Sequence, residues 1–256
     1  MSAIQSDAAE FALAACTAQD RGGRAEQQDR VAILRSRRLP RAALGLLADG
    51  LGGRSGGALA AEQTVMVAQR LFDGFGAGDP VAEFFEDLVT EVHTVIRLSA
   101  MTIALEPHTT LAAVLLQPGR VDWCHVGDSR IYHFRGNRVA HRSCDDTYAA
   151  QLVAEGRLKP DKARLHPSAG LLTQALGGQR RPHPTLGGVR EPDIRDRFAL
   201  CSDGLWAHVS DAEMAGFVDS LPPRQAAEQL LTLAAERARG QGDNCSIVLF
   251  RLEPAA

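Results

Sequence analysis

Residues 111–141 read LAAVLLQPGRVDWCHVGDSRIYHFRGNRVAH, and they hold four short apolar runs separated by turn residues. The runs cover residues 111–116, 121–126, 131–134 and 139–141. Pro118-Gly119 separates the first two runs, and Arg135-Gly136-Asn137 separates the last two. Connections this short join antiparallel strands, because a parallel crossover needs about a dozen or more residues. The stretch therefore predicts antiparallel meanders.

The same kinds of pattern continue on both sides of this stretch. Apolar runs predict further strands at 31–34, 43–47, 198–201 and 246–252. Apolar residues at helical spacing predict helices at 56–72, 81–96 and 222–239. The helix at 81–96 has the clearest pattern, and we expect Asp79 as its N-cap and Pro80 in its first turn.

Residues 146–196 interrupt the pattern with five prolines and six glycines. Apart from a helical piece at 148–156, this range predicts an inserted lobe. Helices and antiparallel strands are partly segregated along the chain, which favours an α+β fold of stacked layers. The length of 256 residues suits one large domain, which we expect to span 1–256.

Four aspartates lie next to glycines at the ends of apolar runs. Asp49, Asp128 and Asp203 follow predicted strands, and Asp243 precedes one. We expect these side chains to meet at one edge of a sheet. Two carboxylates at ~4 Å repel by about 4 kcal/mol at an effective dielectric constant near 20. A cluster of this kind needs a cation, and an all-oxygen ligand set favours Mg²⁺ or Mn²⁺ over zinc.

Composition narrows the possible partners and the compartment. The formal charge of −3 does not favour nucleic acid as a partner. No apolar stretch approaches ~18 residues, so we expect no membrane partner. Residues 1–10 include Asp7 and Glu10 and lack a basic segment, so we expect no signal peptide. Five scattered cysteines suit a reducing cytoplasm, and we expect a cytoplasmic monomer.

A charged loop, DRGGRAEQQD at 20–29, precedes the first aspartate motif. By itself it is an ordinary charged loop. It is followed in order by Asp-Gly-Leu-Gly-Gly at 49–53, Gly-Asp-Ser-Arg at 127–130, Ser-Asp-Gly-Leu at 202–205 and Gly-Asp-Asn at 242–244. Each motif alone is weak, but the five in this order are specific. From about Ala18 to Arg251, the chain resembles the metal-dependent serine/threonine protein phosphatases of type 2C, in their short bacterial form.

The resemblance implies a role for each residue of the candidate site. Asp49 corresponds to the carboxylate that bridges two Mn²⁺ or Mg²⁺ ions, and the carbonyl of Gly50 to a ligand of one of them. Asp203 and Asp243 correspond to the terminal ligands. Two further assignments complete the metal and water sites: Asp128, with Asp203, matches a third metal site, and Asp29 matches an acid that orders water.

Arg24 corresponds to the residue that binds the substrate phosphate, because a planar guanidinium can pair with two phosphate oxygens. Ser129 and Arg130 are expected to be structural. The resemblance also implies a four-layer α/β/β/α sandwich of two antiparallel sheets flanked by helices. In that fold, 146–196 is a flap beside the site.

The chain departs from the family pattern at four places. Gln28 replaces a common glutamate, and the loop before Arg24 is one residue short. Asp146 stands where histidine is frequent, and Leu51 where bacterial members usually have methionine. The glycines at 52–57 could also form a nucleotide phosphate loop, but no Gly-Lys-Ser/Thr follows them.

The sequence therefore predicts a phosphatase that hydrolyses phosphoserine and phosphothreonine in proteins. The expected partners are phosphorylated proteins, including a serine/threonine kinase or its targets. Two alternatives stay open. One is a catalytically weak relative that binds phosphoproteins as a regulator, and the other is a phosphatase of a partner-switching stress pathway.

Overall fold

Two antiparallel five-stranded sheets face each other in the computed structural model, which describes residues 11–36, 38–52, 56–102 and 105–254. The first sheet has the strand order β1 (Phe11–Asp20), β12 (Cys245–Pro254), β11 (Asp196–Cys201), β8 (Arg130–Arg135) and β9 (Arg138–Arg142). The second has the order β10 (Thr185–Arg190), β7 (Arg120–Val126), β6 (Leu111–Gln117), β3 (Ala43–Ala48) and β2 (Arg30–Arg35). A two-stranded ribbon joins β4 (Gly50–Leu51) to β5 (His108–Thr109).

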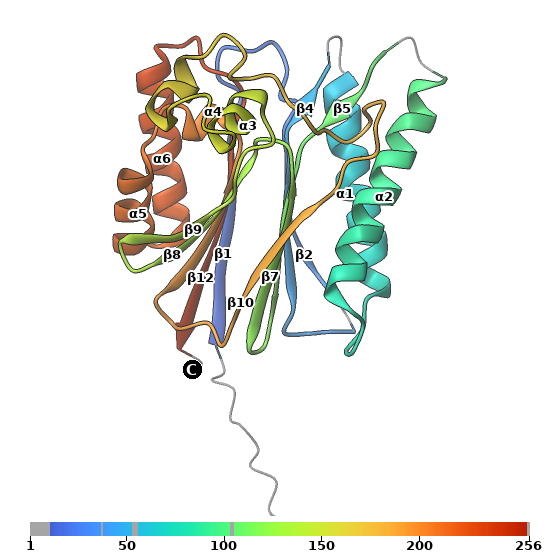
Figure 1. The fold of residues 1–256 in the computed structure, drawn as a ribbon. Helices are drawn as coiled ribbons and strands as arrows, with labels where there is room; N and C mark the ends of the chain where they lie inside the picture. Colours follow the sequence, from blue (N-terminus) through green and yellow to red (C-terminus); the bar gives the residue numbers. More distant parts are fainter. Residues whose placement is uncertain (1–10, 37, 53–55, 103–104, 255–256) are drawn as a thin grey trace, which may run out of the picture.

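Helices cover the outer face of each sheet, as Figure 1 shows. The second sheet is covered by α1 (Gly56–Gly74) and α2 (Val81–Ala100). The first is covered by α5 (Asp211–Ser220) and α6 (Pro223–Ala238). The predicted α/β/β/α sandwich is therefore confirmed. The shorter helices are α3 (Tyr148–Ala154), the 3₁₀ helix η1 (Pro160–Leu165) and α4 (Asp203–Trp206).

The central strands are apolar on both faces because both faces are covered. In β6, Leu111, Ala113 and Leu115 pack toward the helices. Their neighbours Ala112, Val114 and Leu116 pack between the two sheets. A strand buried on both faces reads as a continuous apolar run, without the alternation of a strand with one solvated face. This explains why the sequence predicted these strands but not which side each residue faces.

The prediction of meanders is correct for two hairpins and wrong between them. β6 pairs with β7, and β8 pairs with β9, both antiparallel. However, β7 and β8 belong to different sheets. The chain crosses between the sheets through Gly127, which has a φ of +99°, and so places Asp128 at one end of the sandwich, between the end of β7 and the start of β8.

Several elements differ from the expectation in extent or were not predicted. The N-cap of α2 is Pro80, and Asp79 instead accepts a hydrogen bond from the amide of Gly76. The sequence did not predict β1, β10, α4 or α5. β10 lies within 146–196 yet pairs with β7 in the second sheet, so the residues outside the sheets end at 184.

The expectation about a signal peptide at 1–10 lies outside the described residues, as does Gly53 of the glycine-rich segment. Among the helices that the structure describes, none combines the length and the apolar character needed to cross a membrane.

Close contact between the sheets gives a testable prediction at Gly45 in β3. A Cβ at this position would overlap the ring of Phe250 in β12, and it would lie 3.5 Å from Val248 Cγ1. We expect Gly45→Ala to lower the free energy of unfolding by about 1–3 kcal/mol, as overpacking does. The matched control is Gly216→Ala in α5, where nothing lies within 4 Å. It should raise stability by up to ~1 kcal/mol. Urea unfolding measures both, and equal effects would contradict the prediction.

Candidate metal centre

Loops at one end of the sandwich bring the predicted aspartates together. Asp49 follows β3, Asp128 lies in the crossing between β7 and β8, Asp203 begins α4, and Asp243 lies just before β12. The charges of these residues and of Asp29 act on one another. The structure therefore gathers carboxylates from both sheets at the end that carries α4 and β4 in Figure 1.

Burial and mutual repulsion raise the pKa values of these carboxyls. The pKa of Asp49 is well above its usual range, first because of burial and then because of the charges of Asp29, Asp203, Asp128 and Asp243. Burial, followed by the charges of Asp128 and Asp243, raises the pKa of Asp203 to about 7. Burial, followed by Asp145, raises that of Asp128 to about 6. Each shift shows that the ionised group lacks enough positive charge around it.

The backbone of Asp49 is held by two threonines: Thr109 at the end of β5, and Thr110 just before β6. The amide of Asp49 donates to Thr110 Oγ1 at 3.0 Å. Its carbonyl accepts from Thr109 Oγ1 at 2.9 Å and from the Thr110 amide at 2.9 Å. The sequence did not predict this role of Thr109 and Thr110, because two threonines before an apolar run are an ordinary pattern.

Asp29 is 1% exposed, and only one of its two carboxylate oxygens has a hydrogen-bond partner among the described residues. Its Oδ2 accepts from Ser202 Oγ at 2.9 Å, while its Oδ1 is buried and has no hydrogen-bond partner among the described residues. Burial raises its pKa. A buried carboxylate oxygen without a partner is costly, so it marks a position where a water or a cation can bind. The role of Asp29 as an acid that orders water stays a prediction.

Arg24 lies beside the aspartates despite the short loop that precedes it. Its Nη2 lies 2.5 Å from Asp243 Oδ2, and the two side chains are 61% and 39% exposed. The amide of Gly23 donates to the carbonyl of Gly242 at 2.8 Å, which joins the Arg24 loop to the Asp243 loop. The structure brings the predicted phosphate ligand to the site, and its role stays a prediction.

Asn244 fastens the same two loops, a role that the sequence did not reveal although Gly-Asp-Asn was recognised as a motif. Its Oδ1 accepts from the amide of Gln28 at 2.8 Å. Its Nδ2 donates to the carbonyls of Arg21 and Glu26, both at 2.9 Å. A cleft of about 540 Å³ opens between these loops, and its lining includes Arg24, Asp49, Gly50 and Asp243.

The donor set fits hard divalent cations. It consists of carboxylate and carbonyl oxygens, which Mg²⁺ and Mn²⁺ prefer. In the part of the chain that the structure describes, no three His, Cys, Asp or Glu side chains form a ready-made metal site. The described carboxyls therefore act on one another electrostatically without forming a ligand cage in the metal-free protein. The raised pKa values and the partnerless Asp29 oxygen indicate where positive charge is missing.

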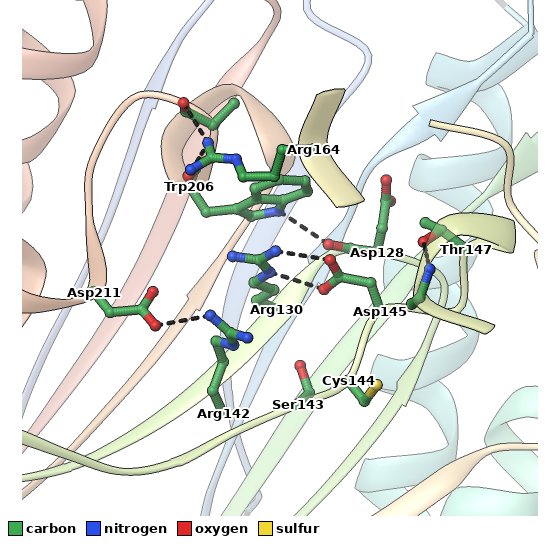
Figure 2. Close-up of polar contacts among 12 residues, drawn as sticks. Asp128, Arg130, Arg142, Ser143, Cys144, Asp145, Thr147, Arg164, Trp206 and Asp211 are labelled. Carbon is green, nitrogen blue, oxygen red and sulfur yellow. Dashed lines mark hydrogen bonds and ion pairs between the residues drawn. The ribbon is translucent and has the colours of Figure 1, made fainter. Parts of the chain in front are cut away.

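The residues after Asp128 are structural, as expected from the sequence. Arg130 is 8% exposed and donates to both carboxylate oxygens of Asp145, at 2.8 and 2.7 Å. Its guanidinium carbon lies 3.8 Å from the ring centroid of Trp206 (Figure 2). Asp146, which follows Asp145 in the chain, accepts a hydrogen bond from the amide of Gly127 at 2.9 Å. Asp146 therefore ties the base of the predicted flap to the crossing that carries Asp128.

Trp206 connects the predicted flap with the candidate metal ligand Asp128, as Figure 2 shows. Its indole N–H donates to the carbonyl of Asp128 at 3.0 Å. Arg164 of η1 donates to the carbonyls of Trp206 and Ala207, at 3.1 and 2.5 Å. These two carbonyls are at the end of the short helix α4, whose first residue is Asp203. The position of η1 is therefore linked to the backbone of both Asp128 and Asp203.

Comparison with known proteins gives a family match over nearly the whole chain. The family model for protein phosphatase 2C matches residues 20–248. The serine/threonine protein phosphatase PstP of Mycobacterium tuberculosis is 35% identical over 209 residues, which cover 79% of this chain and 39% of that protein. The chain thus spans well under half the length of this relative. Protein phosphatase PhpP of Streptococcus pneumoniae is 28% identical over 210 residues, which cover 81% of this chain and 85% of that protein.

A solved structure shows the same fold with metal bound. The catalytic domain of PstP in complex with two manganese ions matches with a TM-score of 0.81 and 30% identity. The match covers 95% of this chain and 100% of that structure.

The raised pKa values predict the pH dependence of the metal-free protein. Asp203 and Asp128 keep a proton in the folded state at pH values where the unfolded chain, with an Asp pKa near 3.9, has already lost it. Their stabilising contribution is full below about pH 4 and is lost as the pH rises to about 7. Urea unfolding in EDTA should therefore give lower stability at about pH 8 than at about pH 5. Saturating Mn²⁺ should remove this fall. A free energy of unfolding in EDTA that rises between about pH 5 and pH 8 would contradict the raised pKa values of Asp203 and Asp128.

The Arg164 contacts predict a second outcome. Arg164→Ala removes the hydrogen bonds to the Trp206 and Ala207 carbonyls, so amides of α3 and η1 should exchange hydrogen about 3–10-fold faster, a loss of roughly 0.6–1.4 kcal/mol. Arg157→Ala is the matched control, because Arg157 is exposed in the same lobe and pairs with Glu155. Equal exchange rates in the two variants would show that Arg164 does not hold the lobe.

Proposed function

The chain belongs to the protein phosphatase 2C family, and from this premise we propose that it hydrolyses phosphoserine and phosphothreonine in proteins with Mn²⁺ or Mg²⁺. One observation carries the proposal: five aspartates from both sheets converge at one edge of the sandwich, with an arginine beside them. The relatives named above are serine/threonine protein phosphatases, and the structure of one of them contains two manganese ions.

In this proposal, Asp49 and the carbonyl of Gly50 hold the central positions, because both lie on the cleft and the backbone of Asp49 is fixed by threonines. Asp203 and Asp243 supply the outer ligands, and Asp128 with Asp203 supplies a third site. When bound, divalent ions make water nucleophilic at neutral pH and neutralise charge on the phosphoryl oxygens.

Asp29 positions the attacking water in this proposal. Its Oδ2 is fixed by Ser202, and its Oδ1 is a buried acceptor that is free to receive a hydrogen from water. Arg24 binds the substrate phosphate. In the metal-free protein its guanidinium pairs with Asp243, so binding of a cation at Asp243 would release it for a phosphate that needs the same planar donors.

The natural partners proposed here are phosphorylated proteins, including a serine/threonine kinase or its targets. The proposal places the protein in the cytoplasm as a monomer. The five free cysteines support this setting, because free thiols persist in a reducing compartment. No feature favours the alternative of a weak phosphoprotein-binding regulator, because each candidate carboxylate lies at the shared edge.

The test is hydrolysis of a phosphothreonine peptide before and after removal of metal. Protein stripped with EDTA should be inactive and should recover with Mn²⁺ or Mg²⁺, because the aspartates cannot bind a phosphate without cations between them. The same protein dialysed without chelator is the control. Full activity in excess EDTA would overturn the metal-dependent mechanism.

A matched pair of arginine variants tests the phosphate ligand. Arg24→Ala removes charge-assisted hydrogen bonds worth about 1.5–3 kcal/mol, so kcat/KM should fall roughly 10–150-fold. Arg24→Lys should restore only part of it, since an ammonium cannot make the paired contact. Arg21→Ala, three residues earlier in the same loop, should change kcat/KM little. If Arg21→Ala is the damaging variant and Arg24→Ala is silent, the phosphate ligand is Arg21.

A further inference from the structure

A second, larger cleft adjoins the candidate metal centre. It has a volume of about 1150 Å³ and lies between α3 and η1 on one side and α4 and the start of α5 on the other. We propose that this cleft binds the polypeptide next to the phosphorylated residue and selects substrates with a large apolar side chain there. The inference rests on the proposed function and deepens it by naming a substrate class.

The cleft is continuous with the metal centre. Asp128 and Asp203 line it, whereas Asp49 and Asp243 line the smaller cleft that contains Arg24. The aspartates therefore lie between the two clefts. A phosphoresidue bound at the aspartates, with its phosphate toward Arg24, has its neighbouring residues next to the larger cleft.

The lining of the larger cleft combines charged residues with many small apolar ones. It has six alanines, from both of its sides: Ala149, Ala150, Ala163, Ala169, Ala207 and Ala212. Val153 and Val209 add to this surface, and Leu165 of η1 is 78% exposed at the cleft. Small side chains leave space, and an apolar wall rewards burial of an apolar group. The smaller cleft, in contrast, is lined mainly by charged, amide and glycine residues.

The arginines of the larger cleft already have partners. Arg130 pairs with Asp145, and Arg142 pairs with Asp211 at 2.8 Å. Arg164 binds two carbonyls of α4, as Figure 2 shows. An acidic substrate side chain would have to break one of these contacts, whereas an apolar side chain would not. The pairing of the arginines therefore favours an apolar occupant over an acidic one.

The test compares two phosphothreonine peptides, one with leucine and one with glycine on both sides of the phosphorylated residue. With Mn²⁺ present, kcat/KM for the leucine peptide should be about tenfold higher, which corresponds to about 1.4 kcal/mol. Ala212→Trp narrows the cleft from exposed α5, and it should bring this ratio close to one. Ala169→Trp narrows it from the opposite side and should act in the same way if the first variant folds poorly.

Ala82→Trp, on the exposed face of α2 away from the cleft, is the matched control and should keep the tenfold ratio. A wild-type ratio near one, or a tenfold ratio that persists in both cleft variants, would overturn the proposal. Self-association of the wild-type protein that Ala212→Trp abolishes would also overturn it, because a second copy would then be the occupant.

p-Nitrophenyl phosphate separates failure of the inference from failure of the proposed function. If the Mn²⁺-loaded wild-type protein hydrolyses neither this compound nor the peptides, the proposed function is wrong. In that case the affinities of the two peptides, labelled with fluorescein and measured by anisotropy, test the inference. The leucine peptide should then bind about tenfold more tightly than the glycine peptide.

Discussion

Repulsion among buried carboxylates is the constraint on which the rest of the structure depends. A pair at ~4 Å costs about 4 kcal/mol at an effective dielectric constant near 20, and a domain is stable by only roughly 5–15 kcal/mol. Asp49 is surrounded by four other aspartates, and its pKa is raised by all of them. Such a cluster persists only where a rigid scaffold holds the chain ends and where cations can offset the charge.

The sandwich supplies this scaffold because each aspartate lies within two residues of the end of a strand. The carboxylates come from the ends of strands in both sheets, and the crossing at Gly127 brings Asp128 to one end of the sandwich. Backbone hydrogen bonds to Thr109 and Thr110 fix Asp49, and Asn244 joins the Arg24 loop to the Asp243 loop. On the other side, Arg164 and Trp206 connect η1 to the backbone of Asp128 and Asp203. The contacts that hold Asp49, Asp128 and Asp203 here do not involve their carboxylates, whereas the carboxylates of Asp29 and Asp243 are bound by Ser202 and Arg24.

The sequence revealed the local elements and the motif residues, but it did not reveal how the sheets are divided. Strands 111–116 and 121–126 could be read from their apolar runs and short turns. The sequence could not show that β7 and β8 lie in different sheets, because a three-residue connection also suits a hairpin. Only the packing of both faces of each strand distinguishes a hairpin from a crossing between sheets. β10 was hidden because Thr185–Arg190 contains two glycines and is mostly exposed, so it lacks an apolar pattern. Long-range contacts such as Asn244 to Arg21 leave no trace in local periodicity.

The central claim is that Asp49 lies between two bound cations, and calorimetric titration with Mn²⁺ tests it most directly. The wild-type protein should bind two ions tightly, and Asp49→Asn should lose both tight sites while its circular dichroism stays unchanged. Loss of a side chain that touches the metal costs more affinity than the roughly 10–100-fold lost with a residue that only supports a ligand. Asp87→Asn on the exposed face of α2 is the matched control and should bind as the wild type does. Two tight ions in Asp49→Asn would contradict the account.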